Sequence, residues 1–177
     1  MSNSFGIKNI VQFILFVALQ ILLLDNLVLF GTGFCFIYVA FLLFLPLGIN
    51  RVWLLVLGFA TGFTVDMFYD TVGIHAAASV LLAFLRPHVL NLLTPRDGYD
   101  SSDSVNIHVM GWRWFLVYSF SLIVFHHAAV FFLETINFQT ALYTLGKILF
   151  STFFTGILIV ILQLLFFSPK RARIDYR

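Results

Sequence analysis

Two carboxylates four positions apart are the residues of this sequence with the most potential for chemistry. Asp66 lies inside a long apolar stretch, and Asp70 follows at its end. On a helix the two side chains would share one face, so they could serve as a general acid and base. The sequence has no Gly-x-Ser-x-Gly, phosphate-loop or His-Glu-x-x-His motif, and no obvious nucleophile or oxyanion donor lies near the pair. We therefore expect that the protein is not an enzyme.

The histidines and the cysteine do not form a recognisable metal site. His126 and His127 are adjacent, so they point to different sides of a helix and cannot act as an i, i+4 ligand pair. Glu134 lies two turns beyond His126. The other histidines are His75, His88 and His108. The single cysteine, Cys35, excludes an internal disulfide and a zinc cluster built from cysteines. We expect no metal and no cofactor, and we interpret the histidines as hydrogen-bonding groups between helices.

The composition indicates an integral membrane protein. Hydrophobic residues make up 61% of the 177 residues and charged residues only 10%, whereas a soluble domain has about 25% charged residues. A chain of this length cannot hide so much apolar surface from water, so its solvent must be lipid. The net charge is only +2, and no basic patch is interleaved with aromatic residues. Binding to nucleic acid is therefore not expected.

Six apolar stretches approach the ~17–25 residues that a helix needs to cross a bilayer. They lie near 7–24, 34–49, 52–69, 73–93, 113–133 and 141–167. No small-x-small cleavage site follows the first stretch before Asp25, so it is interpreted as an uncut span. The sequence thus predicts an all-α membrane protein, with residues 1–177 forming a single domain of six transmembrane helices.

The basic residues predict the orientation, since Lys and Arg accumulate on the cytoplasmic side. Nine of the ten fall before the first stretch, in alternate connections or in the tail: Lys8, Arg51, Arg86, Arg96, Arg113, Lys170, Arg171, Arg173 and Arg177. The opposite connections hold no basic residue, and their charged residues are the acidic Asp25, Asp70 and Glu134. Both termini are therefore expected in the cytoplasm, together with the 94–111 connection and a basic tail at 168–177. The acidic 94–111 connection is interpreted as a solvated linker or as a partner-docking loop.

Small residues predict that the third and fourth stretches pack closely as a hairpin. Gly58 and Gly62 form a Gly-x-x-x-Gly pair, a spacing that lets helix backbones approach each other. The fourth stretch presents Ala76, Ser79 and Ala83 on one face. The connection at 69–72 is short enough for the two helices to be neighbours.

Polar residues form a stripe along the last stretch. Thr144, Lys147, Ser151 and Thr155 recur at helical spacing, so this face is expected to meet protein rather than lipid. The first stretch carries a weaker stripe: Asn9, Gln12 and Gln20.

A carboxylate inside the membrane costs about 2.5–3.5 kcal/mol on insertion scales, so Asp66 should have a partner or a role. We expect an ion pair with Lys147, because both residues lie within about two turns of the outer boundary. In the alternative, Asp66 caps the turn or meets interfacial water while Lys147 extends outward.

Residues 57–99 resemble the rod shape-determining protein MreD family. That family has a Gly-x-x-x-Gly-x-x-x-Asp helix, a turn, and then Gly-hydrophobic-x-Ala at the start of the next helix. Here these positions are Gly58, Gly62, Asp66, Gly73 and Ala76. The size, the topology and the exit from the fourth stretch at 86–97 are similar too. The 69–72 turn lacks the glycine and serine often seen there, and the 94–111 connection is longer and more acidic than expected.

The resemblance implies a non-enzymatic protein of the bacterial inner membrane that belongs to the elongasome, the machinery for lateral peptidoglycan synthesis. It implies binding to the periplasmic scaffold protein MreC. Indirect links to an MreB-like filament, a RodA-like glycosyltransferase and a transpeptidase penicillin-binding protein are also implied. The fold would be similar to the substrate-binding subunits of energy-coupling-factor vitamin transporters.

We therefore expect a scaffold needed for cell shape. Besides the small residues that pack the hairpin, it has a polar set within the membrane: Asp66, Asp70, His75, Lys147, Ser151 and Thr155. The alternative is the substrate-binding subunit of a vitamin-type uptake transporter. Such subunits dock their transport module through an Ala-x-x-x-Ala pair on the first span, where this chain has only Ala18. A polar pocket open to the outside would favour this alternative.

Overall fold

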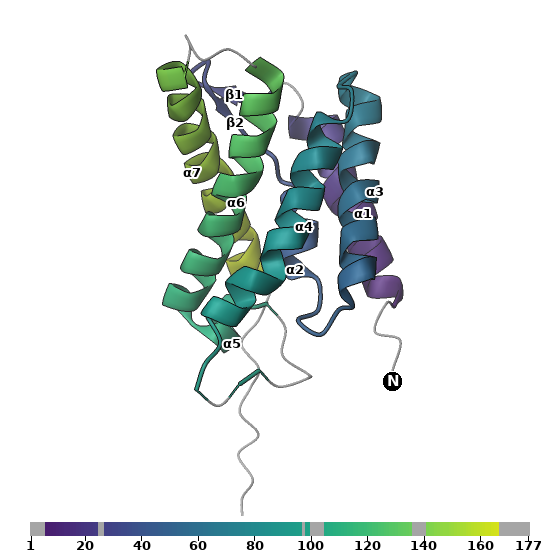
Figure 1. The fold of residues 1–177 in the computed structure, drawn as a ribbon, viewed down its shortest axis with the longest axis vertical. Coiled ribbons are helices and arrows are strands. Elements are labelled where there is room, and N and C mark those ends of the chain that lie inside the picture. The colour runs from purple at the N-terminus through teal and green to yellow at the C-terminus, as the bar shows by residue number, and fades with distance from the viewer. Residues whose placement is uncertain (1–5, 25–26, 97, 100–104, 136–140, 167–177) are drawn as a thin grey trace, which may run out of the picture.

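The computed structural model describes residues 6–24, 27–96, 98–99, 105–135 and 141–166, and this part of the chain is mostly helical. The long helices run along the longest axis of the molecule (Figure 1). The elements in chain order are α1 Ile7–Leu19, the π-helix η1 Gln20–Leu24, β1 Val28–Leu29, β2 Gly33–Phe34, α2 Val39–Phe44, α3 Arg51–Tyr69, α4 Ile74–Leu92, α5 Ile107–Met110, α6 Trp112–Thr135 and α7 Ala141–Phe166. The predicted basic tail at 168–177 lies outside the described residues, as do Asp25 and positions 97 and 100–104 of the 94–111 connection.

Four of the predicted spans are helices long and apolar enough to cross a membrane. Within the described residues they are Ile7–Leu24, Arg51–Tyr69, Trp112–Thr135 and Ala141–Phe166. The helix α4 is as long as α3, with 19 residues each, but it is not among the four. Its sequence includes Arg86, Pro87 and two histidines, which lower its hydropathy.

The prediction of a membrane-spanning helix at 34–49 is wrong. Within this segment the helix α2 has only six residues, so at ~1.5 Å per residue it is far shorter than a bilayer. The residues before it are extended, and β2 pairs with β1 as an antiparallel ribbon in which Leu29 faces Gly33. The segment is apolar because protein surrounds it: residues 35–45 are no more than 8% exposed. The high hydropathy of this segment therefore reflects burial in the protein core rather than contact with lipid.

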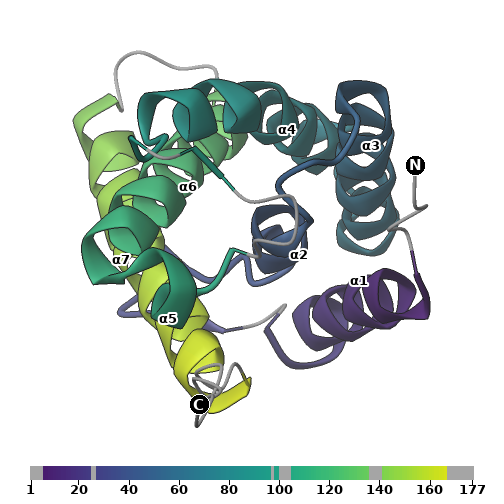
Figure 2. The same cartoon turned by 90° about the horizontal axis from the view of Figure 1, so that it is seen from below.

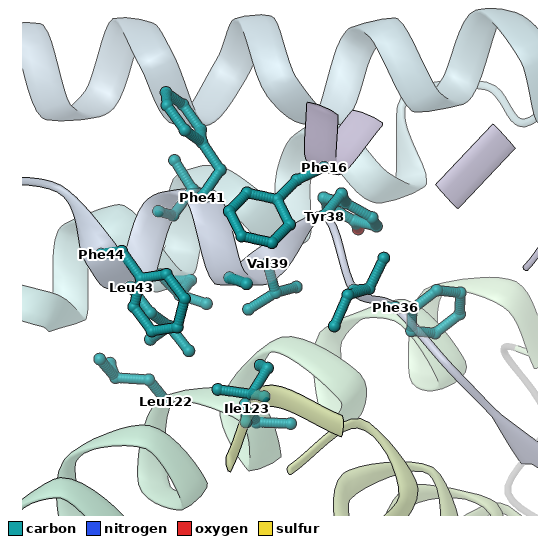
Figure 3. Packing of buried hydrophobic residues seen from close by; sticks show 14 of the residues in the cluster. Phe16, Phe36, Tyr38, Val39, Phe41, Leu43, Phe44, Leu122 and Ile123 are labelled. Atoms are coloured by element: carbon teal, nitrogen blue, oxygen red, sulfur yellow. The ribbon is translucent and has the colours of Figure 1, made fainter. Parts of the chain in front are cut away.

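The helix α2 lies at the centre of the bundle. Seen along the bundle axis, it is surrounded by α1, α3, α4, α6 and α7 (Figure 2). Its side chains pack against Phe16 of α1 on one side and against Leu122 and Ile123 of α6 on the other (Figure 3). The core of the molecule is therefore built around the short helix and the extended segment that precedes it.

The polar stripe of α7 faces this extended segment, as the prediction that it meets protein requires. The hydroxyl oxygen of Ser151 accepts a hydrogen bond from the Phe34 N–H at 2.9 Å, and that of Thr155 accepts one from the Phe36 N–H at 3.1 Å. On the other side, Gln20 Nε2 donates to the carbonyl oxygen of Cys35 at 3.0 Å. Backbone groups outside regular structure need such partners when no water is present. The stripe therefore supplies hydrogen-bond partners to backbone groups that have none from a regular helix.

The helices α3 and α4 form the closely packed hairpin that the small residues predict. A Cβ atom at Gly58 would lie 2.9 Å from the Ser79 carbonyl oxygen and 3.0 Å from Ala83 Cβ. A Cβ atom at Gly62 would overlap the backbone of His75 and Ala76. Only glycine fits at either position without a shift of the partner helix.

The 94–111 connection is not a fully solvated linker. Val105, Asn106 and Ile107 are buried, at no more than 7% exposure. The side chain of Gln163 on α7 accepts a hydrogen bond from the Ile107 N–H and donates one to the Val105 carbonyl, both at 3.3 Å. The described carboxyl-terminal part of the connection is therefore part of the bundle, and its local sequence did not indicate this because the contact residue lies 56 positions away.

Candidate functional site: the Asp66 joint and the adjoining pocket

Asp66 joins the end of α3 to the start of α4. Its Oδ1 accepts a hydrogen bond from the backbone N–H of His75 at 3.0 Å, and its Oδ2 accepts one from that of Ala76 at 2.9 Å. The hydroxyl of Thr71 donates to Oδ1 at 2.5 Å, and His75 Nδ1 lies 3.0 Å from the same oxygen. Asp66 is only 4% exposed, yet both of its oxygens have partners.

These contacts explain why a carboxylate is tolerated at this depth. The first N–H groups of a helix have no acceptor within the helix, and a polar side chain at the N-cap normally supplies one. The N-cap residue of α4 is Gly73, which has no side chain to do so. Asp66 supplies the missing acceptor from α3, and its negative charge lies at the positive end of the α4 dipole. The residue predicted as a joint between helices is thus a cap provided by the neighbouring helix.

The turn between the helices uses two left-handed residues. Asp70 has φ 52° and Gly73 has φ 78°. The backbone N–H groups of Asp70 and Thr71 both donate to the Asp66 carbonyl, which ends α3. Aspartate is one of the few residues other than glycine that adopt this conformation readily. Asp70 therefore takes the place of the glycine that this turn lacks.

The predicted ion pair between Asp66 and Lys147 is not formed. Lys147 Nζ instead lies 3.4 Å from Glu134 Oε2, and over the rings of Phe34 and Phe131, at 4.9 and 4.7 Å from their centroids. Asp66 takes its partners from the α3–α4 turn and the start of α4. Similar depth in two helices did not imply contact, because the backbone amides that satisfy Asp66 leave no signal in the sequence.

Asp66 and Asp70 are not arranged as an acid and base pair. Asp66 is enclosed and holds the end of α4, whereas Asp70 is exposed and caps the end of α3. The geometry therefore gives Asp66 a structural role and leaves the side chain of Asp70 accessible to solvent or to a ligand.

A second buried joint was missed by sequence reasoning. Arg86 of α4 is 1% exposed, although the sequence places it with the basic residues of a cytoplasmic connection. Its Nε donates to the Tyr118 hydroxyl at 2.7 Å, and its terminal nitrogens donate to the carbonyls of Leu45 and Pro46. Tyr118 in turn donates to the Leu43 carbonyl at 2.9 Å. The cation therefore satisfies the negative end of the α2 dipole. An arginine within an apolar stretch was the available signal.

The paired histidines are buried and bonded to different elements. His126 Nε2 lies 2.8 Å from the Tyr38 hydroxyl, whereas His127 Nε2 lies 3.2 Å from the Thr155 hydroxyl. They link α6 to the segment before α2 and to α7. Among the described residues, no group of three or more His, Cys, Asp or Glu side chains could hold a metal ion.

A pocket of about 280 Å³ adjoins the Asp66 joint. It adjoins the α3–α4 turn, and this turn lies at the upper end of the bundle in Figure 1. Its polar lining comes from η1, the turn, α4 and α6: Gln20, Tyr69, Asp70, Thr71, His75 and Glu134. Its apolar lining includes Phe34, Phe36 and Phe131. The exposed residues Phe68, Asp70 and Glu134 form part of its lining, so the pocket opens at this end.

The structure thus divides the residues that the sequence singled out. Gly58, Gly62, Ala76, Ser79 and Ala83 lie in the α3–α4 contact, and Gly73 lies in the turn. Ser151 and Thr155 bond the extended segment, and Lys147 lies near the pocket wall. Asp70 and His75 line the pocket itself. Gln20 was noted only as part of a weak stripe, and its place in the pocket could not be predicted.

Comparison with known proteins adds no relative. No family model, no curated protein and no solved structure matches this chain.

Proposed function

We propose that this protein is a membrane scaffold of the bacterial elongasome, with the inner membrane as its location and an MreC-like periplasmic protein as its direct partner. In this account it holds its partner in place and catalyses nothing. The four apolar helices support a membrane location. Six passes with both termini in the cytoplasm are part of the proposal, with residues 34–49 as a broken pass.

The observation that carries the proposal is the structural role of the motif residues. Gly58 and Gly62 permit the close contact of α3 with α4, and Asp66 caps α4. All three therefore maintain a rigid hairpin rather than a reaction centre. A motif devoted to rigidity suits a protein whose task is to present a fixed surface to a partner.

A groove beside the hairpin suits the membrane span of such a partner. It has a volume of about 470 Å³ and lies between α4 and α6. Its lining is apolar and includes the small residues Ala77, Ala128 and Ala129. Small residues let a second helix approach closely within a membrane. We place the single span of the partner here.

Purification in a gentle detergent tests the scaffold proposal. The tagged chain is isolated from bacterial membranes, and the proteins that accompany it are identified. The proposal predicts a protein with one membrane span and a periplasmic coiled coil. Co-purification of an ATPase transport module would contradict it.

The second candidate function is a substrate-binding subunit of an uptake transporter. The pocket beside Asp66 favours it, because several polar groups converge on a space that opens at one end of the bundle. The first helix counts against it, since α1 and η1 contain Ala18 as their only alanine. Uptake assays on cells that carry or lack the chain, with the pull-down above, separate the two functions.

A further inference from the structure

The pocket beside the Asp66 joint offers more hydrogen-bond acceptors than its own donors satisfy. Gln20 is the clearest case, with an exposure of only 1%. Its Nε2 donates to the Cys35 carbonyl at 3.0 Å and to the Tyr69 hydroxyl at 2.6 Å. The carbonyl can only accept, so this contact fixes which end of the amide is nitrogen. The Oε1 atom, which is itself buried, then has no hydrogen-bond partner among the described residues.

His75 adds a second acceptor to the lining. Its Nδ1 lies 3.0 Å from Asp66 Oδ1, an arrangement in which the ring donates its proton to the carboxylate. In a neutral imidazole with Nδ1 protonated, Nε2 is an acceptor. The Asp66 joint therefore also sets the hydrogen-bonding character of the pocket.

The charges at this end of the bundle are negative in sum. Asp70 and Glu134 line the pocket, and Asp66 lies directly behind His75. Among the described residues, Lys147 is the one basic side chain paired with these groups, through Glu134. These groups thus comprise three carboxylates and one lysine, which pairs with Glu134.

The aromatic wall of the pocket already holds an ammonium group. Lys147 Nζ lies 4.9 Å from the centroid of Phe34 and 4.7 Å from that of Phe131, and both rings line the pocket. A cation over an aromatic face is attracted by the ring quadrupole. Phe36 and Tyr69 offer further aromatic surface within the pocket.

From these features we propose that the pocket binds a primary ammonium group carried by a small ligand. The ammonium would donate to Gln20 Oε1 and His75 Nε2, with the charges of Asp70 and Glu134 nearby. The volume of about 280 Å³ suits a short alkylamine or an amino acid rather than a large cofactor. This inference does not rest on the scaffold function, because a scaffold and a transport subunit could both carry such a site.

Calorimetric titration of the full chain in phosphatidylcholine nanodiscs tests the proposal. The probes are n-butylammonium, n-butanol and butyrate, which have similar apolar tails and different head groups. We expect saturable binding of the amine alone. Equal binding of the alcohol, binding of butyrate alone, or no amine binding would overturn the proposal.

Charge-removing variants locate the site. Glu134→Gln and Asp70→Asn change exposed side chains, and asparagine also accepts the left-handed conformation of position 70. Each should weaken amine binding about tenfold, the effect of losing the attraction of one nearby opposite charge. Asp175→Asn removes a carboxylate from the basic tail and should leave binding unchanged. Wild-type affinity in both pocket variants would contradict the assignment.

An ethanolamine phospholipid presents the same ammonium group as a soluble amine. Nanodiscs made with and without phosphatidylethanolamine distinguish the two sources. If this lipid abolishes the n-butylammonium signal in the wild type and does so less in Glu134→Gln, the head group occupies the site. If it has no effect, the ligand is a soluble amine.

Discussion

At the scale of single residues, Asp66 is the centre of the molecule's polar chemistry. It accepts two backbone hydrogen bonds at the start of α4 and contacts Thr71 and His75. The sequence predicted that this residue has a structural partner within the membrane. It did not reveal the partner, because any sequence can supply backbone amides and only the turn geometry aims them at the carboxylate.

Replacement of Asp66 should destabilise the fold in proportion to the acceptors lost. Asp66→Leu leaves the His75 and Ala76 amides without an acceptor, and a lost cap costs about 1 kcal/mol while each unsatisfied buried group costs about 1–3 kcal/mol. Asp66→Asn keeps one carbonyl oxygen and should lose less. Thermal unfolding in detergent measures both variants, with the exposed Asp70→Asn as the control. Equal unfolding temperatures for wild type and Asp66→Leu would show that the cap is dispensable.

Double-mutant cycles separate the observed ion pair from the predicted one. Lys147→Met combined with Glu134→Gln should give a small coupling free energy, about 0.2–1 kcal/mol, since Glu134 is half exposed. Lys147→Met combined with Asp66→Asn should give almost none, because the two side chains have separate partners. A coupling above about 1 kcal/mol in the second cycle would restore the predicted pair.

At the scale of elements, the pairing of α3 with α4 could be predicted and the shape of residues 34–49 could not. Gly58 and Gly62 indicated close contact because only small residues permit it. Hydropathy could not distinguish a segment enclosed by protein from one enclosed by lipid, since both are apolar. The polar stripe of α7 was the one hint, because it indicated a face that meets protein, and its Ser151 and Thr155 bond the backbone of this segment.

Two glycine substitutions test the hairpin at this scale. Gly62→Ala places a Cβ into the backbone of α4, and overpacking of this kind costs about 1–3 kcal/mol. Gly146→Ala on α7 meets no neighbouring atom and should stabilise its helix by about 0.5–1 kcal/mol. Unfolding temperatures of the two variants should move in opposite directions. A neutral Gly62→Ala would show that the two helices can separate slightly without loss.

At the scale of the whole molecule, the chain alternates between two ends of one bundle. The α3–α4 turn lies at one end, and α3 and α6 begin at the other (Figure 1). The pocket is lined by residues of this turn. The distribution of basic residues along the sequence predicts that the second end faces the cytoplasm. Arg86 should be removed from the basic residues counted for this prediction, because its side chain is buried inside the fold.

Cysteine labelling tests this orientation. Val72 in the α3–α4 turn is 98% exposed and Val52 at the start of α3 is 67% exposed, whereas the native Cys35 is buried at 2%. A membrane-impermeant maleimide should label Val72→Cys on intact spheroplasts, and Val52→Cys only after the membrane is opened. Labelling of Val52→Cys on intact spheroplasts would reverse the assigned sides.

The scaffold account is tested most directly by the quantity of partner that groove variants retain. Ala128→Leu fills the groove between α4 and α6, and Gly146→Leu adds a similar side chain to α7 at a position whose Cβ meets no atom within 4 Å. The measurement is the amount of single-span periplasmic protein that co-purifies with each tagged variant, relative to wild type. We predict a loss of most of the partner with Ala128→Leu and wild-type recovery with Gly146→Leu. Equal recovery from both variants, or an ATPase module in place of the periplasmic protein, would contradict the account.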